Sequence, residues 1–488
     1  MSEFILVLDE GTTSTKAMVF GLDGALHGVA QQELTQHYPR PGWVEHDAGE
    51  IWEKTLACMR KVADKFGAEA IGAIGIANQR ETVVAWDKLT LEPLSRAIVW
   101  QDRRTASFCE ELRAAGKEEL VQGKTGLLLD PYFSGTKMRW LLDNDERVSQ
   151  AKAAGRLALG TVDSWLVAKL SGGTHITDAS NASRTQLLAL DGAQFDPELC
   201  DLLGVPMDAL PQIVDTQGEL SQTDAKWLGR EIPITGMVGD QQAATLGQGC
   251  LSLGDAKATY GTGAFVLANM GNELPKSDNR MLGTVLCQIK GVRTYAIEGS
   301  VFVAGSLLQW LRDQLGVISS AAETEALARS IDDSGDVVIV PALSGLGAPH
   351  WRADARGVIT GLSFSSGKAQ VARAALEAMA HQTYDLAQAF AADGAPWGVL
   401  RIDGGMSANN WMAQDIANVL GLAVERPDFV ETTALGAAMS AAVGAGLYGS
   451  LEDAGKNMRG AVKRFEPDMT DDLREERLAR WRKALAVA

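Results

Sequence analysis

Apolar residues in this chain fall into short runs separated by helical stretches, and this alternation favours an α/β architecture. Two pairs of apolar runs flank a tight turn of Gly and Thr, at residues 4–20 and 256–270. Each pair predicts a β-hairpin whose turn exposes backbone N–H groups and hydroxyls. Glycine allows close approach of a ligand, and successive amides form an anion-binding concavity. The two hairpins therefore indicate two similar half-molecules that hold one polyphosphate between them.

Several further apolar runs predict strands that end in polar residues. These runs are 70–76, 97–100, 157–162, 232–238, 337–341 and 399–402. In open α/β sheets ligands bind beyond the carboxyl ends of strands, so the polar ends are candidate site residues. Asp47 and Glu50 predict the start of a helix. The Ala- and Gly-rich stretch 432–446 predicts a helix packed closely against another element, because it is too short to span a membrane.

Length and charge limit the kinds of protein that the chain can be. A chain of 488 residues predicts two domains of roughly 240 residues each, and the repeated plan places them at 1–250 and 251–488. The net charge of −17 argues against nucleic acid or an anionic membrane as partner. Scattered cysteines and histidines predict reduced thiols and no zinc site. The run 4–8 is too short for a signal peptide, so we expect a cytoplasmic protein.

Two aspartates follow predicted strands, and each has a functional and a structural interpretation. Asp9 precedes the first turn, where a carboxylate would repel phosphate unless a cation such as Mg²⁺ lay between them; alternatively it shapes the turn. Asp240 could accept the proton of an alcohol during phosphoryl transfer, or it could be a helix N-cap. Because the two carboxylates and the two hairpins occur together, we favour a Mg²⁺ site at Asp9 and Asp240, with Asp240 as the general base.

Other polar positions remain open from the residues alone. Arg80 and Glu81 combine a donor fork with an acceptor pair, which suits the adjacent hydroxyls of a polyol, but a surface ion pair is the alternative. Residues 404–405 and 345–347 form either turns close to a nucleotide or plain loops. The run 472–477 predicts a solvated helical face.

The chain resembles the FGGY carbohydrate kinases over nearly its whole length, and its longer motifs are similar to those of members that act on glycerol. The motifs lie at 9–13, 41–47, 78–82, 100–105, 130–137, 160–163, 177–185, 239–244, 260–263, 345–349 and 403–405. The resemblance implies a two-domain, actin-like ATPase (ribonuclease H-like) fold with an interdomain cleft. It also implies ATP-dependent, Mg²⁺-assisted phosphorylation of glycerol to sn-glycerol 3-phosphate, and a homodimer or homotetramer.

The resemblance further implies a set of site residues. Those that contact the polyol are Arg80, Glu81, Trp100, Tyr132, Asp240, Gln241 and Phe265, with Trp100 and Phe265 flanking its carbon atoms and Asp240 as the base. Those that meet the phosphates are Thr12, Thr13, Ser14, Lys16 and Thr262. Those that line the nucleotide cleft are Gly305, Gln309, Gly405 and Asn409. The metal would be held by Asp9 and Asp240.

Two departures from the family pattern bear on nucleotide binding. Glu10 stands where the family commonly has Gln, and we expect it to add negative charge near the phosphates. Lys16 stands where Arg is common, and it keeps the charge but not the bidentate fork. We expect activity to survive both changes. Residues 223–231 lack the loop used for regulation in some relatives, so no regulatory mechanism is carried over.

Two rival functions are compatible with the same motifs. One is an FGGY kinase for another polyol or a ketose, such as erythritol or xylulose, which would need a roomier pocket than Trp100 and Phe265 indicate. The other is an actin-like ATPase without a sugar substrate, which would hydrolyse ATP in the absence of any acceptor.

Overall fold

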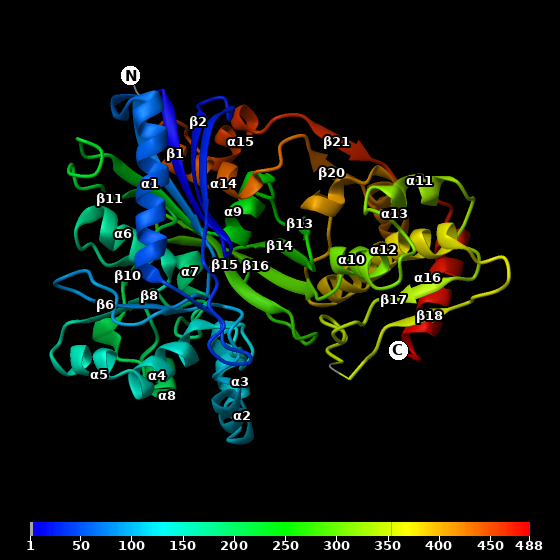
Figure 1. The fold of residues 1–488 in the computed structure, drawn as a ribbon, viewed down its shortest axis with the longest axis horizontal. Coiled ribbons are helices and arrows are strands. Elements are labelled where there is room, and N and C mark those ends of the chain that lie inside the picture. Colours follow the sequence, from blue (N-terminus) through cyan, green and yellow to red (C-terminus); the bar gives the residue numbers. More distant parts are fainter. Residues whose placement is uncertain (1–2, 353) are drawn as a thin grey trace.

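The computed structural model describes residues 3–352 and 354–488. The first half of the chain is built on a six-stranded sheet of order β11-β12-β5-β1-β2-β3, which lies on the left of Figure 1. Its strands are β1 (Phe4–Glu10), β2 (Ser14–Gly21), β3 (Leu26–Glu33), β5 (Ile71–Asn78), β11 (Gln217–Gln222) and β12 (Pro233–Gly239). The helices of this half are α1 (Ala48–Phe66), α2 (Ala106–Ala114), α3 (Glu118–Thr125), α4 (Ser134–Asn144), α5 (Glu146–Ala153), α6 (Val162–Ser171), α7 (Ala179–Ala182), α8 (Pro197–Leu203) and α9 (Asp240–Gly247).

The second half is built on a seven-stranded sheet of order β15-β16-β14-β13-β19-β20-β21. Its strands are β13 (Asp255–Tyr260), β14 (Ala264–Gly271), β15 (Leu282–Ile289), β16 (Val292–Val301), β19 (Val399–Asp403), β20 (Val424–Pro427) and β21 (Val462–Phe465). The helices are α10 (Gly305–Asp313), α11 (Glu323–Arg329), α12 (Lys368–Ala392), α13 (Asn410–Leu420), α14 (Thr432–Gly444), α15 (Leu451–Met458) and α16 (Asp471–Leu485).

Short elements complete both halves. The four two-stranded sheets pair β4 (Glu45–His46) with β7 (Ala97–Ile98), β6 (Val84–Asp87) with β8 (Leu157–Gly160), β9 (Ile176–Asp178) with β10 (Gln212–Val214), and β17 (Val338–Val340) with β18 (Val358–Thr360). The 3₁₀ helices are η1 (Ala68–Ala70), η2 (Met207–Ala209) and η3 (Gly405–Ala408).

The two large sheets share one topology. In the first, β1, β2 and β3 are antiparallel, and β5 and β12 add parallel strands on the other side of β1. In the second, β13, β14 and β16 take the antiparallel positions, and β19 and β20 add the parallel strands. Both predicted hairpins, β1–β2 and β13–β14, are therefore confirmed, and so is the prediction of two similar halves.

The first strand of each sheet has one outer and one inner face. On β1, Leu6 and Leu8 pack with the residues of α1, whereas Ile5 and Val7 pack with those of α14. The same alternation operates on β13, where Tyr260 points outward and its hydroxyl hydrogen bonds to Thr383 of α12 at 2.6 Å. Since successive side chains of a strand point to opposite faces, the inner faces carry Asp9 of β1 and Lys257 of β13.

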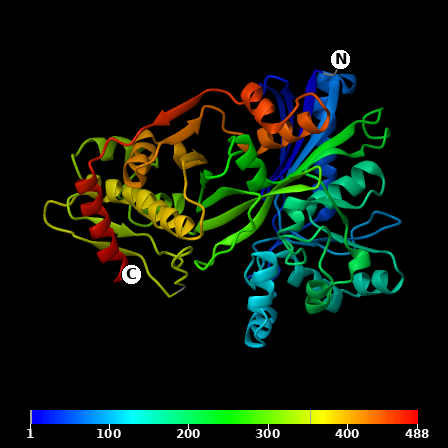
Figure 2. The same ribbon diagram turned by 180° about the vertical axis from the view of Figure 1, so that it is seen from behind.

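The helices α9 and α14 pack between the two sheets at very short range. A Cβ atom at Gly436 would lie 1.8 Å from the carbonyl oxygen of Ala243, and one at Gly247 would lie 2.1 Å from that of Thr432. Figure 2 shows α14 and α15 lying against the blue strands of the first sheet, although they belong to the C-terminal part of the chain. The predicted small-residue helix is therefore confirmed, and it ties the two halves together.

Other predictions of local structure were partly wrong. The run 97–100 forms only the two-residue strand β7, whereas the run 157–162 contains β8 as predicted; both strands belong to small sheets. The run 472–477 lies on α16, but Arg477 is buried and makes two hydrogen bonds to Asp415, at 2.6 and 2.9 Å. An apolar run does not specify its partner strand, and a charged run can turn one member inward.

Three remaining predictions concern local features. Asp47 is the N-cap of α1 and accepts a hydrogen bond from the backbone of Gly49 at 2.8 Å, as predicted. The five cysteines are buried free thiols within the described ranges. Among the described helices, none is both long enough and apolar enough to cross a membrane.

Candidate active site

The first hairpin presents its polar turn at the end of β1. Thr13 is exposed, and Thr12 and Ser14 are partly exposed. The Oγ1 atom of Thr12 accepts a hydrogen bond from Nε1 of Trp100 at 2.8 Å. The turn that is predicted to hold phosphate is therefore hydrogen bonded directly to Trp100, which is predicted to flank the polyol.

Lys16 lies beside Asp9 in the register of β1 and β2. Its Nζ atom donates to both carboxylate oxygens of Glu431, at 3.0 and 2.8 Å. Glu431 is the residue just before α14, so this ion pair joins the first hairpin to the second half of the chain. The cation is thus held at the inner face of the sheet by a carboxylate that the sequence did not single out.

Glu10 does not lie where the sequence placed it. It is completely buried on the outer face of β1, where the hydroxyls of Thr15 and Thr55 donate to its Oε1 atom. Burial raises the pKa of Glu10 to about 8, in spite of the hydrogen bonds from the two threonines. The expectation that Glu10 adds negative charge near the phosphates is wrong, because the side chain points toward α1, where burial favours its uncharged form.

Asp9 and Asp240 lie close enough to influence each other. Burial raises the pKa of Asp9 to about 7; Lys16 opposes the rise, whereas Glu431 and Asp240 add to it. A divalent cation would favour the ionised forms of both aspartates. Mg²⁺ is usually held by one or two carboxylates together with phosphate oxygens and water, so this pair fits a nucleotide-bound Mg²⁺. Among the described residues, no group of three or more His, Cys, Asp or Glu side chains could hold a metal by itself.

Asp240 is the first residue of α9 rather than its N-cap. The N-cap is Gly239, and the Oδ1 atom of Asp240 accepts a hydrogen bond from the backbone N–H of Gln241 at 2.6 Å. The side chain remains 31% exposed. Burial raises its pKa to about 6, although the guanidinium of Arg80 lowers it. The N-cap alternative is therefore wrong, and the carboxylate is available in its ionised form at neutral pH.

The turn after β5 is held in place by its own polar side chains. The amides of Asn78 and Asn181 exchange two hydrogen bonds, at 2.9 and 3.1 Å. Gln79 donates to the carbonyl of Gly11 at 3.1 Å and accepts from the hydroxyl of Thr82 at 2.7 Å. This turn delivers Arg80 and Glu81, which are 3% and 1% exposed. A surface ion pair is therefore excluded as their explanation.

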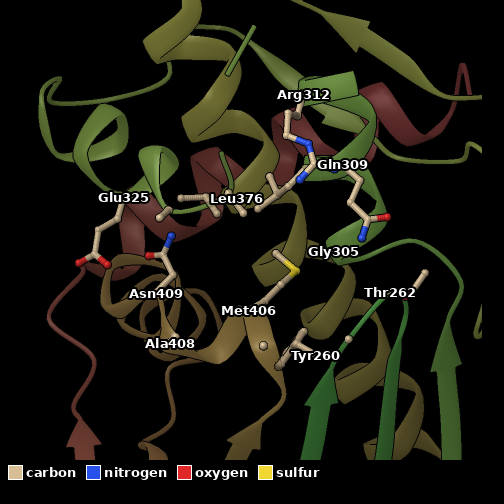
Figure 3. Close-up of a pocket in the computed structure, with 15 residues that line it drawn as sticks. Tyr260, Thr262, Gly305, Gln309, Arg312, Glu325, Leu376, Met406, Ala408 and Asn409 are labelled. Carbon is tan, nitrogen blue, oxygen red and sulfur yellow. The ribbon is translucent and has the colours of Figure 1, made fainter. Parts of the chain in front are cut away.

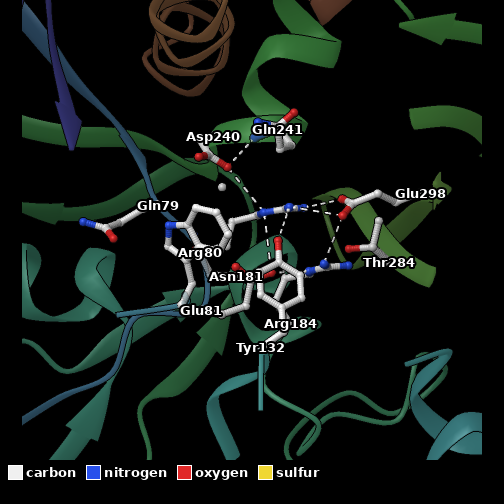
Figure 4. Close-up of polar contacts among 12 residues, drawn as sticks. Gln79, Arg80, Glu81, Tyr132, Asn181, Arg184, Asp240, Gln241, Thr284 and Glu298 are labelled. Carbon is white, nitrogen blue, oxygen red and sulfur yellow. Dashed lines mark hydrogen bonds and ion pairs between the residues drawn. The ribbon is translucent and has the colours of Figure 1, made fainter. Parts of the chain in front are cut away.

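Arg80 is the centre of a buried network that joins both halves (Figure 4). Its guanidinium donates to Glu298 of β16 at 2.6 Å and to the hydroxyl of Tyr132 at 3.2 Å. Its Nε atom lies 3.3 Å from Oδ1 of Asp240. Four of the residues predicted for the polyol, namely Arg80, Glu81, Tyr132 and Asp240, are thus brought together with Gln241 next to them.

A second arginine completes the network. Nε of Arg184 donates to Glu81 at 2.7 Å, and its Nη2 atom donates to Glu298 at 3.2 Å. Burial raises the pKa of Glu298, but Arg184 and Arg80 outweigh it and lower the pKa to about 2. Glu298 therefore stays ionised, and it pairs with both buried guanidinium groups.

The aromatic residues occupy two sides of this region. Trp100 packs edge-on against Tyr132, with ring centroids 5.6 Å apart. Phe265 of β14 lies beside Thr259 in the register of the second hairpin, and Nζ of Lys257 donates to Thr259 at 2.8 Å. Trp100 is thus in direct contact with the network, whereas Phe265 lies in the second sheet, beside Thr259.

A cavity of about 440 Å³ opens beside the turn of the second hairpin (Figure 3). Five residues predicted for the phosphates and the nucleotide line it: Thr262, Gly305, Gln309, Gly405 and Asn409. Apolar side chains of Leu308, Leu376 and Met406 share the lining. An apolar lining with a few polar groups suits a purine base.

Two glycines shape the edge of this cavity. Gly404 has φ +86°, and a Cβ atom there would lie 2.4 Å from the carbonyl oxygen of Tyr260. Gly305 approaches the turn similarly, because its Cβ atom would lie 2.6 Å from the carbonyl of Gly261. The turn at 404–405 thus borders the cavity. The loop at 345–347 instead packs on β16, since a Cβ atom at Gly347 would lie 2.6 Å from the carbonyl of Ser300.

Three buried charged residues of the site were missed by the sequence reasoning: Arg184, Lys257 and Glu298. Glu298 and Lys257 are charged residues with apolar neighbours on both sides or on one side in their strands, which is itself a signal, because a buried charge requires a partner. Arg184 lies in the motif at 177–185, where its type alone did not reveal its role.

Comparison with known proteins places this chain in a family. The model of the FGGY family of carbohydrate kinases matches it twice, with the N-terminal domain at residues 4–247 and the C-terminal domain at 256–445. The chain therefore belongs to the FGGY family of carbohydrate kinases. The resemblance that the sequence motifs indicated is confirmed, and so is the two-domain, actin-like fold.

The individual relatives are similar over nearly the whole chain. A glycerol kinase from Dechloromonas aromatica is 52% identical and covers 99% of this chain and 97% of its own length. A glycerol kinase from Deinococcus radiodurans is 50% identical, covering 100% and 97%. The crystal structure of Plasmodium falciparum glycerol kinase with ADP superimposes with a TM-score of 0.95 at 33% identity, over 99% and 97%.

Proposed function

We propose that this chain transfers the terminal phosphoryl group of ATP to glycerol, which gives sn-glycerol 3-phosphate and ADP. Relatives named glycerol kinase at 50% identity or more over almost the full length of both chains support the substrate. The single observation that carries the proposal is the position of Asp240. Its partly exposed carboxylate lies 3.3 Å from the buried guanidinium of Arg80, in a cluster that connects to the first hairpin through Tyr132, Trp100 and Thr12.

The polyol is held by hydrogen bonds to its hydroxyls and by contacts to its carbon atoms. Arg80 and Gln241 supply donors, Glu81 supplies acceptors, and the hydroxyl of Tyr132 can do both. Trp100 and Phe265 flank the carbon chain. The network around Arg80 fixes these groups before the substrate binds, and such preorganisation lowers the cost of positioning the attacking hydroxyl.

Asp240 is the general base. With a pKa of about 6, it is mostly ionised at pH 7, yet it is more basic than an exposed aspartate. It accepts the proton as the hydroxyl oxygen approaches phosphorus in line with the leaving ADP oxygen. This position at the first turn of α9 also gives it the rigidity that the step requires.

The phosphates lie between the two hairpins. Thr12, Thr13 and Ser14 present hydroxyls and backbone N–H groups from the first turn, and Thr262 does so from the second. Lys16 adds positive charge beside them. Asp9 and Asp240 would hold Mg²⁺, which would neutralise the charge of the transferring phosphoryl group when bound.

The nucleoside part of ATP occupies the cavity of the second half. Gly305, Gln309, Gly405 and Asn409 line it together with Thr262, so the base and the phosphates share one continuous site. This arrangement supports a polyol site in domain 1–250 and an adenine site in domain 251–488. The family matches end at 247 and resume at 256, which is compatible with a boundary there.

A panel of acceptors tests this function. ADP release is measured by a coupled assay with glycerol, erythritol, xylulose or water as acceptor. We expect kcat/KM for glycerol to exceed that for every other acceptor by about tenfold or more, because a pocket shaped for three carbons discriminates by about 1–3 kcal/mol per misplaced group. A preference for xylulose or erythritol, or ATP hydrolysis that does not depend on an acceptor, would contradict the proposal.

A further inference from the structure

Lys257 is a buried cation at the contact of the two halves. It lies in the middle of β13 and is 0% exposed. Its Nζ atom donates to Oε1 of Gln241 at 2.6 Å and to Oγ1 of Thr259 at 2.8 Å. Gln241 belongs to α9 of the first half, whereas β13 belongs to the second. A lysine is rarely buried completely, and the proposed phosphoryl transfer does not yet use this one.

The register of the second sheet directs Lys257 toward the site. Thr259 lies on the same face of β13, and it stands beside Phe265 of β14 and Asp403 of β19. Leu267, which is beside Lys257 in register, packs with Ala243 and Leu246 of α9. The ammonium therefore lies between β13 and α9, on the side that carries Gln241.

The charge of Lys257 determines how Gln241 can act. Burial lowers the pKa of Lys257, and the negative charges of Asp403, Asp240 and Glu298 oppose that fall. An ammonium group donates hydrogen bonds and accepts none, so its partner on Gln241 must be the amide oxygen. The amide NH₂ group is then the part of Gln241 that remains for a ligand. Without the cation, either orientation of the amide would be possible.

We propose that Lys257 is a positioning residue that fixes the amide of Gln241, so that Gln241 donates a hydrogen bond to a hydroxyl oxygen of the polyol. The inference rests on the proposed function. It gives the two neighbouring residues of α9 complementary tasks: Asp240 accepts from one hydroxyl, and Gln241 donates to another. It also makes polyol binding depend on a residue of the second half.

Two single variants and one double variant test the inference through KM and kcat for glycerol and for ATP. K257M should raise KM for glycerol about three- to tenfold, the value of one lost hydrogen bond, and leave KM for ATP within about twofold. In the Q241A background, K257M should change KM for glycerol by less than about twofold, because the two residues act as one unit. An unchanged KM for glycerol in K257M, additive effects, or a rise confined to KM for ATP would overturn the inference.

The variant Q241E tests the inference while Lys257 is kept. A carboxylate at this position keeps the contact with the ammonium but has no hydrogen to donate. We expect KM for glycerol to rise at least about threefold with no loss of thermal stability, and this test holds even if K257M does not fold. Glycerol binding as tight as in the unmodified protein would overturn it. Glycerol-dependent ADP release by the unmodified protein is measured in parallel, so failure of the proposed function is recognised separately.

Discussion

At the residue scale, the direction of a side chain decides its role more than its type does. Asp9 and Glu10 are neighbours with the same chemistry, but they point to opposite faces of β1. Asp9 lies near Lys16 and Asp240, whereas Glu10 lies between Thr15 and Thr55. The two-residue period of a strand could have revealed this, because the apolar residues before them already alternate between α1 and α14.

The variants E10Q and K16M test whether the two faces of the first hairpin differ in their effect on ATP binding. E10Q keeps an acceptor oxygen for both threonines and lies away from the cleft, so we expect KM for ATP to stay within about twofold of the original value. K16M removes the positive charge next to the phosphates and should raise KM for ATP about tenfold, since a charged hydrogen bond contributes about 1.5–3 kcal/mol. The measurement is initial-rate kinetics at saturating glycerol. A change of more than about fivefold in E10Q would mean that Glu10 does reach the nucleotide.

At the scale of elements, the sequence predicts individual hairpins and helices correctly, but it does not predict which strands pair with each other. The hairpins, α9 and α14 follow from contiguous residues, so the sequence predicts them directly. The pairing of β7 with β4 and of β8 with β6 depends on distant residues, and the apolar runs carry no information about it. The same holds for the site: the turn at 79–82 was predicted, but Arg184 and Glu298 were not, because their partners lie far away along the chain. Lys257 was not predicted either, because the sequence does not show that β13 packs on α9, which carries its partner Gln241.

The close contact of α9 with α14 depends on glycine residues, which have no side chain. In G436A, the added methyl group would lie 1.8 Å from the carbonyl of Ala243, and neither helix can move away without disturbing its packing on the sheets. We expect the free energy of unfolding to fall by at least about 2–3 kcal/mol, measured by denaturant titration. The control is G123A in α3, where no atom lies within 4 Å of the added Cβ and a gain of about 0.5–1 kcal/mol is expected. Equal stabilities of the two variants would contradict this account of the helix contact.

At the scale of the whole molecule, each reacting group depends on both halves. The ion pair of Arg80 with Glu298 joins the turn after β5 to β16 of the second sheet, and that of Lys16 with Glu431 joins β2 to the residue before α14. The contact of Lys257 with Gln241 joins β13 to α9 of the first half. A base delivered by the first half faces a nucleotide cavity built by the second. Two halves that come together on ATP and polyol would exclude water, which otherwise competes as acceptor.

The variant D240N tests the central claim most directly, because it preserves the shape of the side chain and removes its basicity. Glycerol and ATP binding are measured by calorimetry, and turnover by glycerol-dependent ADP release. We expect kcat to fall at least about a hundredfold, as for the loss of a general base, while both dissociation constants stay within about tenfold. Turnover at the full rate in D240N would contradict the account, since it would show that the proton of the attacking hydroxyl leaves by another route.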